Sequence, residues 1–241
     1  KLLDPCDPTP SHRSSHRGAM PALPGPLDTP TPAVLSQWLA HSDSKNALVR
    51  VGHCGCRLLL GLHAKNLLKQ SPDNHAKIAN LMGVLFHAER TGRLGKEVMV
   101  VPLVKKAWDR GDYVDFVSKT LVTLYLQFDK VAWFRVAGVM KGDPVPMILR
   151  ALKIITVVWV IDLAREIQAY TRAAAAPDSD SSDKQRELTD RKWAMFRGLA
   201  LVIQGLHISQ LRPHSDIVCG GLGIYTAVFA ALTVYPKPKG A

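Results

Sequence analysis

The side chains best suited to chemistry form a row of cations near the middle of the chain. Arg90, Arg93 and Lys96 stand three residues apart in the segment ERTGRLGK at residues 89–96. Rows of arginine and lysine bind anions that carry phosphate, either lipid headgroups or nucleic acid. A phosphate-binding loop is excluded, because the segment lacks a Gly-Lys-Ser/Thr ending and no strand precedes it.

A second group of candidate binding residues belongs to an earlier amphipathic helix, with Ser44 as its predicted N-cap. Its narrow basic face holds Arg50, His53 and Arg57, opposite a wide apolar face. This division suits a membrane surface, and an ordinary surface helix of a bundle is the alternative. The side chains expected to insert into the membrane are Leu48, Val51, Leu58 and Leu62.

The remaining reactive side chains do not form a catalytic or metal-binding pattern. Cys54 and Cys56 are two apart, so on a helix they point roughly 200° away from each other and cannot clasp one metal ion. No Gly-x-Ser-x-Gly motif and no paired acids are present. We therefore expect no enzyme, no cofactor and no metal site. The histidines are spread along the predicted helices without a metal-ligand pair; they include His53, His63, His75 and His87.

The longest uncharged stretch is near the C-terminus, at residues 217–235. As a helix, about 20 residues rise about 30 Å, the thickness of a bilayer's hydrocarbon core. We predict a transmembrane helix, with a buried core helix as the alternative. Gly223, Ala227 and Ala231 recur every four residues and form a stripe suited to packing against another helix.

A second, internal membrane helix is expected within residues 113–140 or 147–169. Two spans would place both termini in the cytosol, as the distribution of lysine and arginine favours. The uncharged part of the second stretch, residues 154–161, is too short to span alone. The predicted fold is all-α: an amphipathic helical bundle with a C-terminal transmembrane helix and a second membrane helix.

Composition sets the predicted domain organisation. The mean hydropathy is near zero and 47% of the residues are apolar, too polar for a bundle wholly in the bilayer and too apolar for disorder. The net charge of +11 indicates an anionic partner.

Met20 is the first methionine, and we expect the native protein to start there. The predicted regions are a disordered Pro-rich tail at 1–33, an amphipathic helical membrane-associated region at 34–171, a flexible Ala/Asp/Ser linker at 172–190, a helix plus the transmembrane helix at 191–235, and a short basic tail at 236–241.

Three segments, taken in order, resemble the peroxisomal biogenesis factor 11 family, including its glycosomal members. The first is DSKNALVR at 43–50 with CRLLL at 56–60, similar to the family's early Gly-Arg-Asp-Lys helix and its Arg-Leu-Leu continuation. The second is RTGRLGK at 90–96, similar to the element Arg-x-x-Arg-Leu-Gly-Lys. The third is FDKVAW at 128–133, ahead of Gly138, similar to the Asp-x-x-x-Trp segment. Ser44 and Asn46 depart from the pattern, since family members often have Gly or a charged residue there.

The resemblance implies a multi-pass protein of the peroxisomal or glycosomal membrane, with its termini facing the cytosol. Such a protein would remodel and elongate the membrane before fission, homo-oligomerise and contact the fission machinery. The expected contacts with anionic lipid are Arg50, Arg57, Arg90, Arg93 and Lys96.

Two alternative functions follow from the residues. The first is a pore for small metabolites, which would recruit polar residues from Thr120, Thr123, Gln127 and Lys130. The second is a soluble basic helical protein that binds nucleic acid. No base-reading module is apparent, so no nucleic-acid partner is expected.

Overall fold

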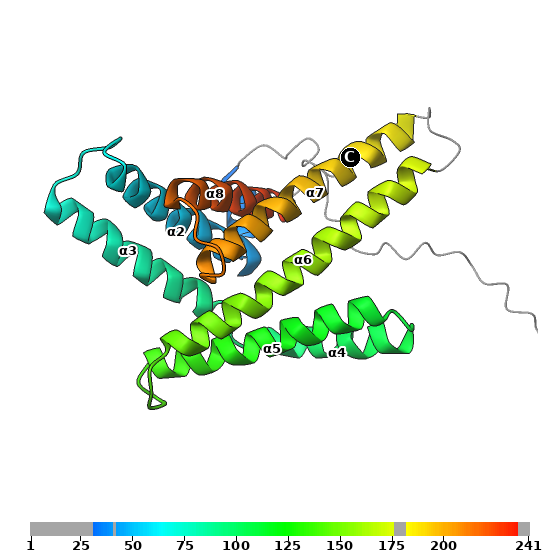
Figure 1. The fold of residues 1–241 in the computed structure, drawn as a ribbon, viewed down its shortest axis with the longest axis horizontal. Helices are drawn as coiled ribbons and strands as arrows, with labels where there is room; N and C mark the ends of the chain where they lie inside the picture. The colour runs from blue at the N-terminus through cyan, green and yellow to red at the C-terminus, as the bar shows by residue number, and fades with distance from the viewer. Residues whose placement is uncertain (1–30, 41, 176–181, 236–241) are drawn as a thin grey trace, which may run out of the picture.

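The computed structural model describes residues 31–40, 42–175 and 182–235. Within these ranges the chain forms eight α-helices and no strand, which confirms the all-α prediction. Residues 1–30 of the tail predicted at 1–33, and the tail predicted at 236–241, lie outside the described residues, whereas residues 32 and 33 are helical. The helices are α1 (Pro32–Ala40), α2 (Ser42–Ala64), α3 (Pro72–Thr91), α4 (Glu97–Asp109), α5 (Tyr113–Val136), α6 (Val145–Ala175), α7 (Ser182–Ile208) and α8 (Asp216–Thr233) (Figure 1).

Local side-chain hydrogen bonds set the first turns of several helices. The Ser71 hydroxyl accepts from the backbone N–H of Asn74 at the start of α3, and Ser215 caps α8 in the same way through Ile217. The prediction that Ser44 caps α2 is wrong. This helix begins at Ser42, so Ser44 lies inside its first turn and is fully buried.

Helices α2, α3, α5, α6, α7 and α8 pack on one another in a closed ring, and α4 lies outside it on α5. α3 packs on α2, α2 on α8, α8 on α7, α7 on α6, α6 on α5, and α5 on α4; a small contact between α3 and α5 closes the ring. Figure 1 shows the long α6 and α7 crossing the molecule side by side, with the α4–α5 hairpin against one side of α6. Since α4 packs only on α5 among the described elements, much of its surface is left uncovered.

The most extensive contact between two helices is that of α2 with α8, which meet through glycines. A Cβ at Gly61 would lie 2.8 Å from the backbone nitrogen of Ile217, and a Cβ at Gly220 would lie 2.7 Å from that of Leu58. These contacts are with backbone atoms, which cannot move aside as a flexible side chain would. Glycine at both positions is therefore required for α2 and α8 to cross at this distance.

The stripe of small residues on α8 is in the interior. Gly223, Ala227 and Ala231 are all buried. A Cβ on Gly223 would lie 2.4 Å from the Cys54 sulfur of α2 and 2.6 Å from the Gln204 side chain of α7. The stripe therefore lies where three helices meet.

Helix occupies most of the linker predicted at residues 172–190. α6 continues to Ala175 and α7 begins at Ser182, so only residues 176–181 of that stretch lie outside the described residues. Alanine has the highest helix propensity, which favours the extension of α6. In α7, Arg191 donates two hydrogen bonds to Glu187 one turn earlier, which supports the helix there.

α8 is a candidate membrane span by its length and hydropathy, and it is the one such helix among the described residues. A share of 39% of its apolar window is buried inside the protein, chiefly against α2 and α7. Neither α5 nor α6 meets the same criteria, because charged side chains interrupt both helices. The internal second span stays a prediction.

Candidate membrane-binding surface

Two of the five predicted lipid-contacting cations bind an aspartate of α5. Arg90 donates from Nε to Asp129 Oδ1 (2.8 Å) and from Nη2 to the Asp129 carbonyl (2.9 Å), and it is only 1% exposed. Arg93 donates to Asp129 Oδ2 (3.2 Å) and to Glu89 Oε1 (2.8 Å). We call Glu89, Arg90, Arg93 and Asp129 the α3–α5 clasp. These guanidinium groups hold the ring of helices closed.

The electrostatics of the clasp favour its charged state. Burial alone would raise the pKa of Glu89, but the nearby His53 ring and the charges of Arg93 and Arg50 outweigh it and hold this pKa at about 2. Burial alone would lower the pKa of Arg93, but Tyr125, Glu89 and Asp129 raise it. Glu89 and Arg93 therefore stay ionised throughout the physiological pH range.

The other three predicted cations also have partners within the protein. Arg50 donates to Gln204 of α7 (2.7 Å), Arg57 pairs with Asp216 at the start of α8 (3.2 Å), and Lys96 pairs with Asp43 of α2 (2.7 Å). All three side chains keep some exposure to solvent, whereas Arg90 is enclosed and is not presented to a headgroup in this conformation. For these cations, lipid contact stays a prediction.

The predicted membrane-inserting residues of α2 lie largely against protein. Leu48 is 40% exposed, while Val51, Leu58 and Leu62 are half-buried. Leu58 lies directly under Gly220 of α8. The apolar side of α2 therefore contributes to packing, and it is not the most exposed apolar surface of the molecule.

Among the described residues, the two most exposed large apolar side chains are neighbours on α4, which the sequence did not single out as a membrane-binding helix; Leu67 and Val139, in turns, are nearly as exposed. Val98 is 74% exposed and Met99 is 72% exposed, although both are fully apolar. The opposite side of α4 holds Ala107, which is fully buried, and Val100, which packs on the core around Tyr125. The sequence signal for this exposed surface was the uninterrupted apolar run VMVVPLV at residues 98–104. Such a run places apolar residues on all sides of a helix, and a helix packed on one neighbour cannot bury them all.

Further exposed apolar side chains lie near the turn of the α4–α5 hairpin, on both helices. The Trp108 ring of α4 contacts the rings of Tyr113 and Phe116, with centroids 6.0 and 5.1 Å apart. Exposed apolar patches of this kind mark sites of protein or membrane contact. We define the α4–α5 outer surface as Val98, Met99, Val101, Leu103 and Trp108 of α4 with Tyr113, Val114, Val117 and Leu124 of α5.

Four polar residues named for a pore come from α5. Thr120, Thr123 and Gln127 line a groove between α4 and α5, whereas Lys130 pairs with Glu97 at the start of α4. Both threonine hydroxyls donate to backbone carbonyls one turn earlier in their own helix. The groove therefore offers few free polar groups.

Comparison with protein-family models, curated proteins and solved structures finds no match to this chain. The resemblance to the peroxisomal biogenesis factor 11 family therefore rests on the sequence segments alone. Within the described residues, no three His, Cys, Asp or Glu side chains gather as a metal site. The cysteines of that part, Cys54, Cys56 and Cys219, are buried and unpaired.

Proposed function

We propose that this protein remodels and elongates a peroxisomal or glycosomal membrane by inserting the α4–α5 outer surface into one leaflet. The observation that carries the proposal is the exposure of Val98 and Met99 on a helix whose second half carries Lys105, Lys106 and Trp108. Apolar residues beside lysine and an aromatic ring are typical of helices that lie in the membrane interface.

The size of α4 favours insertion into a single leaflet. Its 13 residues rise about 20 Å, which is too short for a hydrocarbon core of about 30 Å. A helix that enters only one leaflet expands the area of that leaflet and so favours curvature. Lys105 and Lys106 strengthen the contact with anionic lipid by about 1 kcal/mol each.

Attachment to the membrane is proposed to involve α8, with both termini facing the cytosol and a second span in α5 or α6. Carbonate extraction tests the anchor, because an integral protein stays in the pellet. Protease protection of tagged termini tests the topology. If carbonate releases the protein, α8 is a core helix and the protein binds only at the membrane surface.

Binding to vesicles tests the insertion of α4. We expect the full chain to sediment with vesicles that contain anionic lipid and to convert them to tubules. The double variant V98D/M99D should lose both activities, because it places two carboxylates in the leaflet. The matched control is V84D on α3, where the valine is 65% exposed but lies outside the outer surface. Equal loss in V84D, or no loss in V98D/M99D, would contradict the proposal.

The cellular part of the proposal concerns the organelle and the partners. We expect a tagged chain to accumulate at peroxisomes or glycosomes and to elongate them when overproduced, through homo-oligomers that recruit fission proteins. Cross-linking of the membrane-bound protein measures the oligomer. The alternative of a solute pore predicts conductance in planar bilayers, and nucleic-acid binding predicts salt-dependent retention on DNA.

A further inference from the structure

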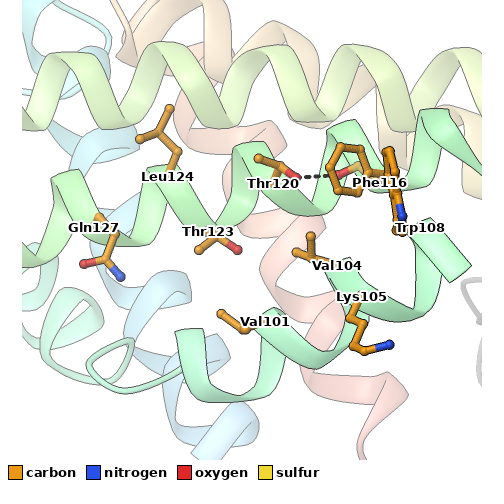
Figure 2. A pocket seen from close by; sticks show the side chains of 9 residues that line it. All are labelled: Val101, Val104, Lys105, Trp108, Phe116, Thr120, Thr123, Leu124 and Gln127. Atoms are coloured by element: carbon orange, nitrogen blue, oxygen red, sulfur yellow. Dashed lines mark hydrogen bonds between the residues drawn. The ribbon is translucent and has the colours of Figure 1, made fainter.

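The α4–α5 groove is an open hollow between the two helices of the hairpin. It has a volume of about 530 Å³, within the range of roughly 300–1,000 Å³ that is usual for small-molecule sites. Figure 2 shows the lining side chains on both helices, with Val104 and Thr123 between them. The lining residues are Val101, Val104, Lys105 and Trp108 of α4 and Phe116, Thr120, Thr123, Leu124 and Gln127 of α5.

The groove is apolar along its length and polar near its ends. Thr120 Oγ1 donates to the Phe116 carbonyl (2.8 Å) and Thr123 Oγ1 donates to the Lys119 carbonyl (3.0 Å), so neither hydroxyl needs a partner from a ligand. Gln127 lies at one end and Lys105 toward the other (Figure 2). Lys105 is the one charged residue of the lining, so the groove fits a long apolar chain that carries one anionic head.

The length of the groove matches the length of one acyl chain. Along α5 it runs from Phe116 to Gln127, which corresponds to a rise of about 16 Å. Half of a hydrocarbon core of about 30 Å is about 15 Å, the depth covered by one acyl chain. An extended acyl chain therefore fits the groove from end to end.

The groove also opens on the outer surface that is proposed to enter the leaflet. Val101, Trp108 and Leu124 line the groove and are themselves 53%, 58% and 44% exposed. A lipid with two chains could place one in the groove and leave the other in the leaflet. Lys105 Nζ now pairs with Asp109 (2.7 Å), but both side chains are more than half exposed and such pairs are weak, so a phosphate can replace the carboxylate.

We propose that the α4–α5 groove binds one acyl chain of an anionic phospholipid, whose phosphate is held by Lys105. This inference rests on the proposed function, because it takes the ligand from the leaflet that α4 enters. It adds a discrete site with a stoichiometry of one lipid per chain. A fixed stoichiometry distinguishes lipid bound in this site from lipid attracted to the protein surface in general.

Native mass spectrometry of the full chain in detergent, with phosphatidylglycerol added, tests the site. We expect one retained lipid per chain. T120F fills the groove and should lower retention about tenfold, an effect equal to the apolar contacts of roughly two methylene groups. The matched control is T171F on α6, because Thr171 is exposed and donates to the Ile167 carbonyl one turn earlier, as Thr120 does to Phe116. Equal retention in T120F and wild type would overturn the proposal.

A charge variant tests the headgroup contact independently of groove filling. K105Q should lower retention of phosphatidylglycerol about fivefold, to the level of phosphatidylcholine. K77Q is the control, because Lys77 makes a similarly exposed pair with Asp73 within α3. If K105Q and K77Q behave alike, Lys105 does not hold the phosphate and the proposal fails in this form.

Three further outcomes identify the source of the acyl chain and distinguish failure of the groove proposal from failure of the proposed function. Displacement of phosphatidylglycerol by an equimolar amount of palmitate would assign the groove to free fatty acids and overturn the phospholipid proposal. Vesicle binding without a retained lipid would overturn the groove while sparing the proposed function. Retention that T120F abolishes, in a protein that does not bind vesicles, would support the groove and contradict the proposed function.

Discussion

Helix α5 joins two regions that place their side chains in opposite ways. Toward its end, Asp129 is buried and binds Arg90 and Arg93 in the α3–α5 clasp. Toward its start, Tyr113 and Val117 are exposed on the α4–α5 outer surface. Charges lie inside at one end of the helix, and apolar groups lie outside at the other.

The two regions differ because they meet different numbers of neighbours. The clasp lies where α3 reaches α5 and where His53 of α2 approaches Glu89, with Nδ1 3.8 Å from Oε2. Charges can be buried there because each finds an opposite charge. The outer surface belongs to a hairpin in which α4 packs only on α5 among the described elements. A basic motif therefore need not mark the membrane-binding surface, and an apolar helix with few neighbours is the better candidate.

The largest expected effect comes from breaking the clasp. D129A removes the carboxylate but leaves Arg90 buried, which should lower the free energy of unfolding by about 3–5 kcal/mol. The measurement is urea unfolding in detergent, followed by circular dichroism. D73A is the control, because Asp73 pairs with Lys77 on the surface and its loss should cost about 1 kcal/mol or less. A similar small loss in D129A would show that the clasp is not structural.

The pH dependence of the clasp gives the next largest effect. The pKa of Glu89 is about 2 in the folded protein against an ordinary value of 4.5, so between these values the unfolded chain binds more protons. Glu89 should therefore stabilise the fold fully above about pH 5, and roughly 3 kcal/mol of that stability should be lost as the pH falls toward 2. Comparing unfolding of wild type and E89Q across this range isolates the contribution. Parallel stability curves would contradict it.

On the outer surface, the same kind of change should spare the fold and weaken only the membrane contact. V98D removes an exposed apolar side chain, so the free energy of unfolding should change by about 0.5 kcal/mol or less. Vesicle binding should weaken by about tenfold, because roughly 1.5 kcal/mol of apolar transfer free energy is lost. Destabilisation comparable to that of D129A would show that Val98 packs against protein.

The smallest effect concerns the lysines beside the outer surface. K106Q should weaken binding to anionic vesicles about fivefold, because each lysine near such a surface contributes about 1 kcal/mol. Binding to zwitterionic vesicles should not change. Titration against the fraction of anionic lipid measures both. An equal change on both kinds of vesicle would mean that Lys106 acts through packing.

Much of the fold could be predicted from local patterns. The helical periodicity is readable in the sequence, and so are the serines Ser71 and Ser215 that cap α3 and α8. Helix boundaries were less certain, since the start of α2 and the linker at 172–190 both differ from the prediction. In each case a longer helix forms where a break was expected, because packing and helix propensity outweigh a weak local signal.

By itself, the sequence determined that the chain is helical, that one C-terminal helix is apolar enough to span a membrane, and that small residues recur along it. Those features depend on neighbours within a few turns. Only the tertiary structure decided which charges are paired and which apolar residues stay exposed. Arg90 and Asp129 are 39 residues apart, and Arg57 and Asp216 are 159 apart, so no local pattern relates them. The exposure of Val98 likewise depends on which helices fail to cover α4, because burial is a property of the assembled helices.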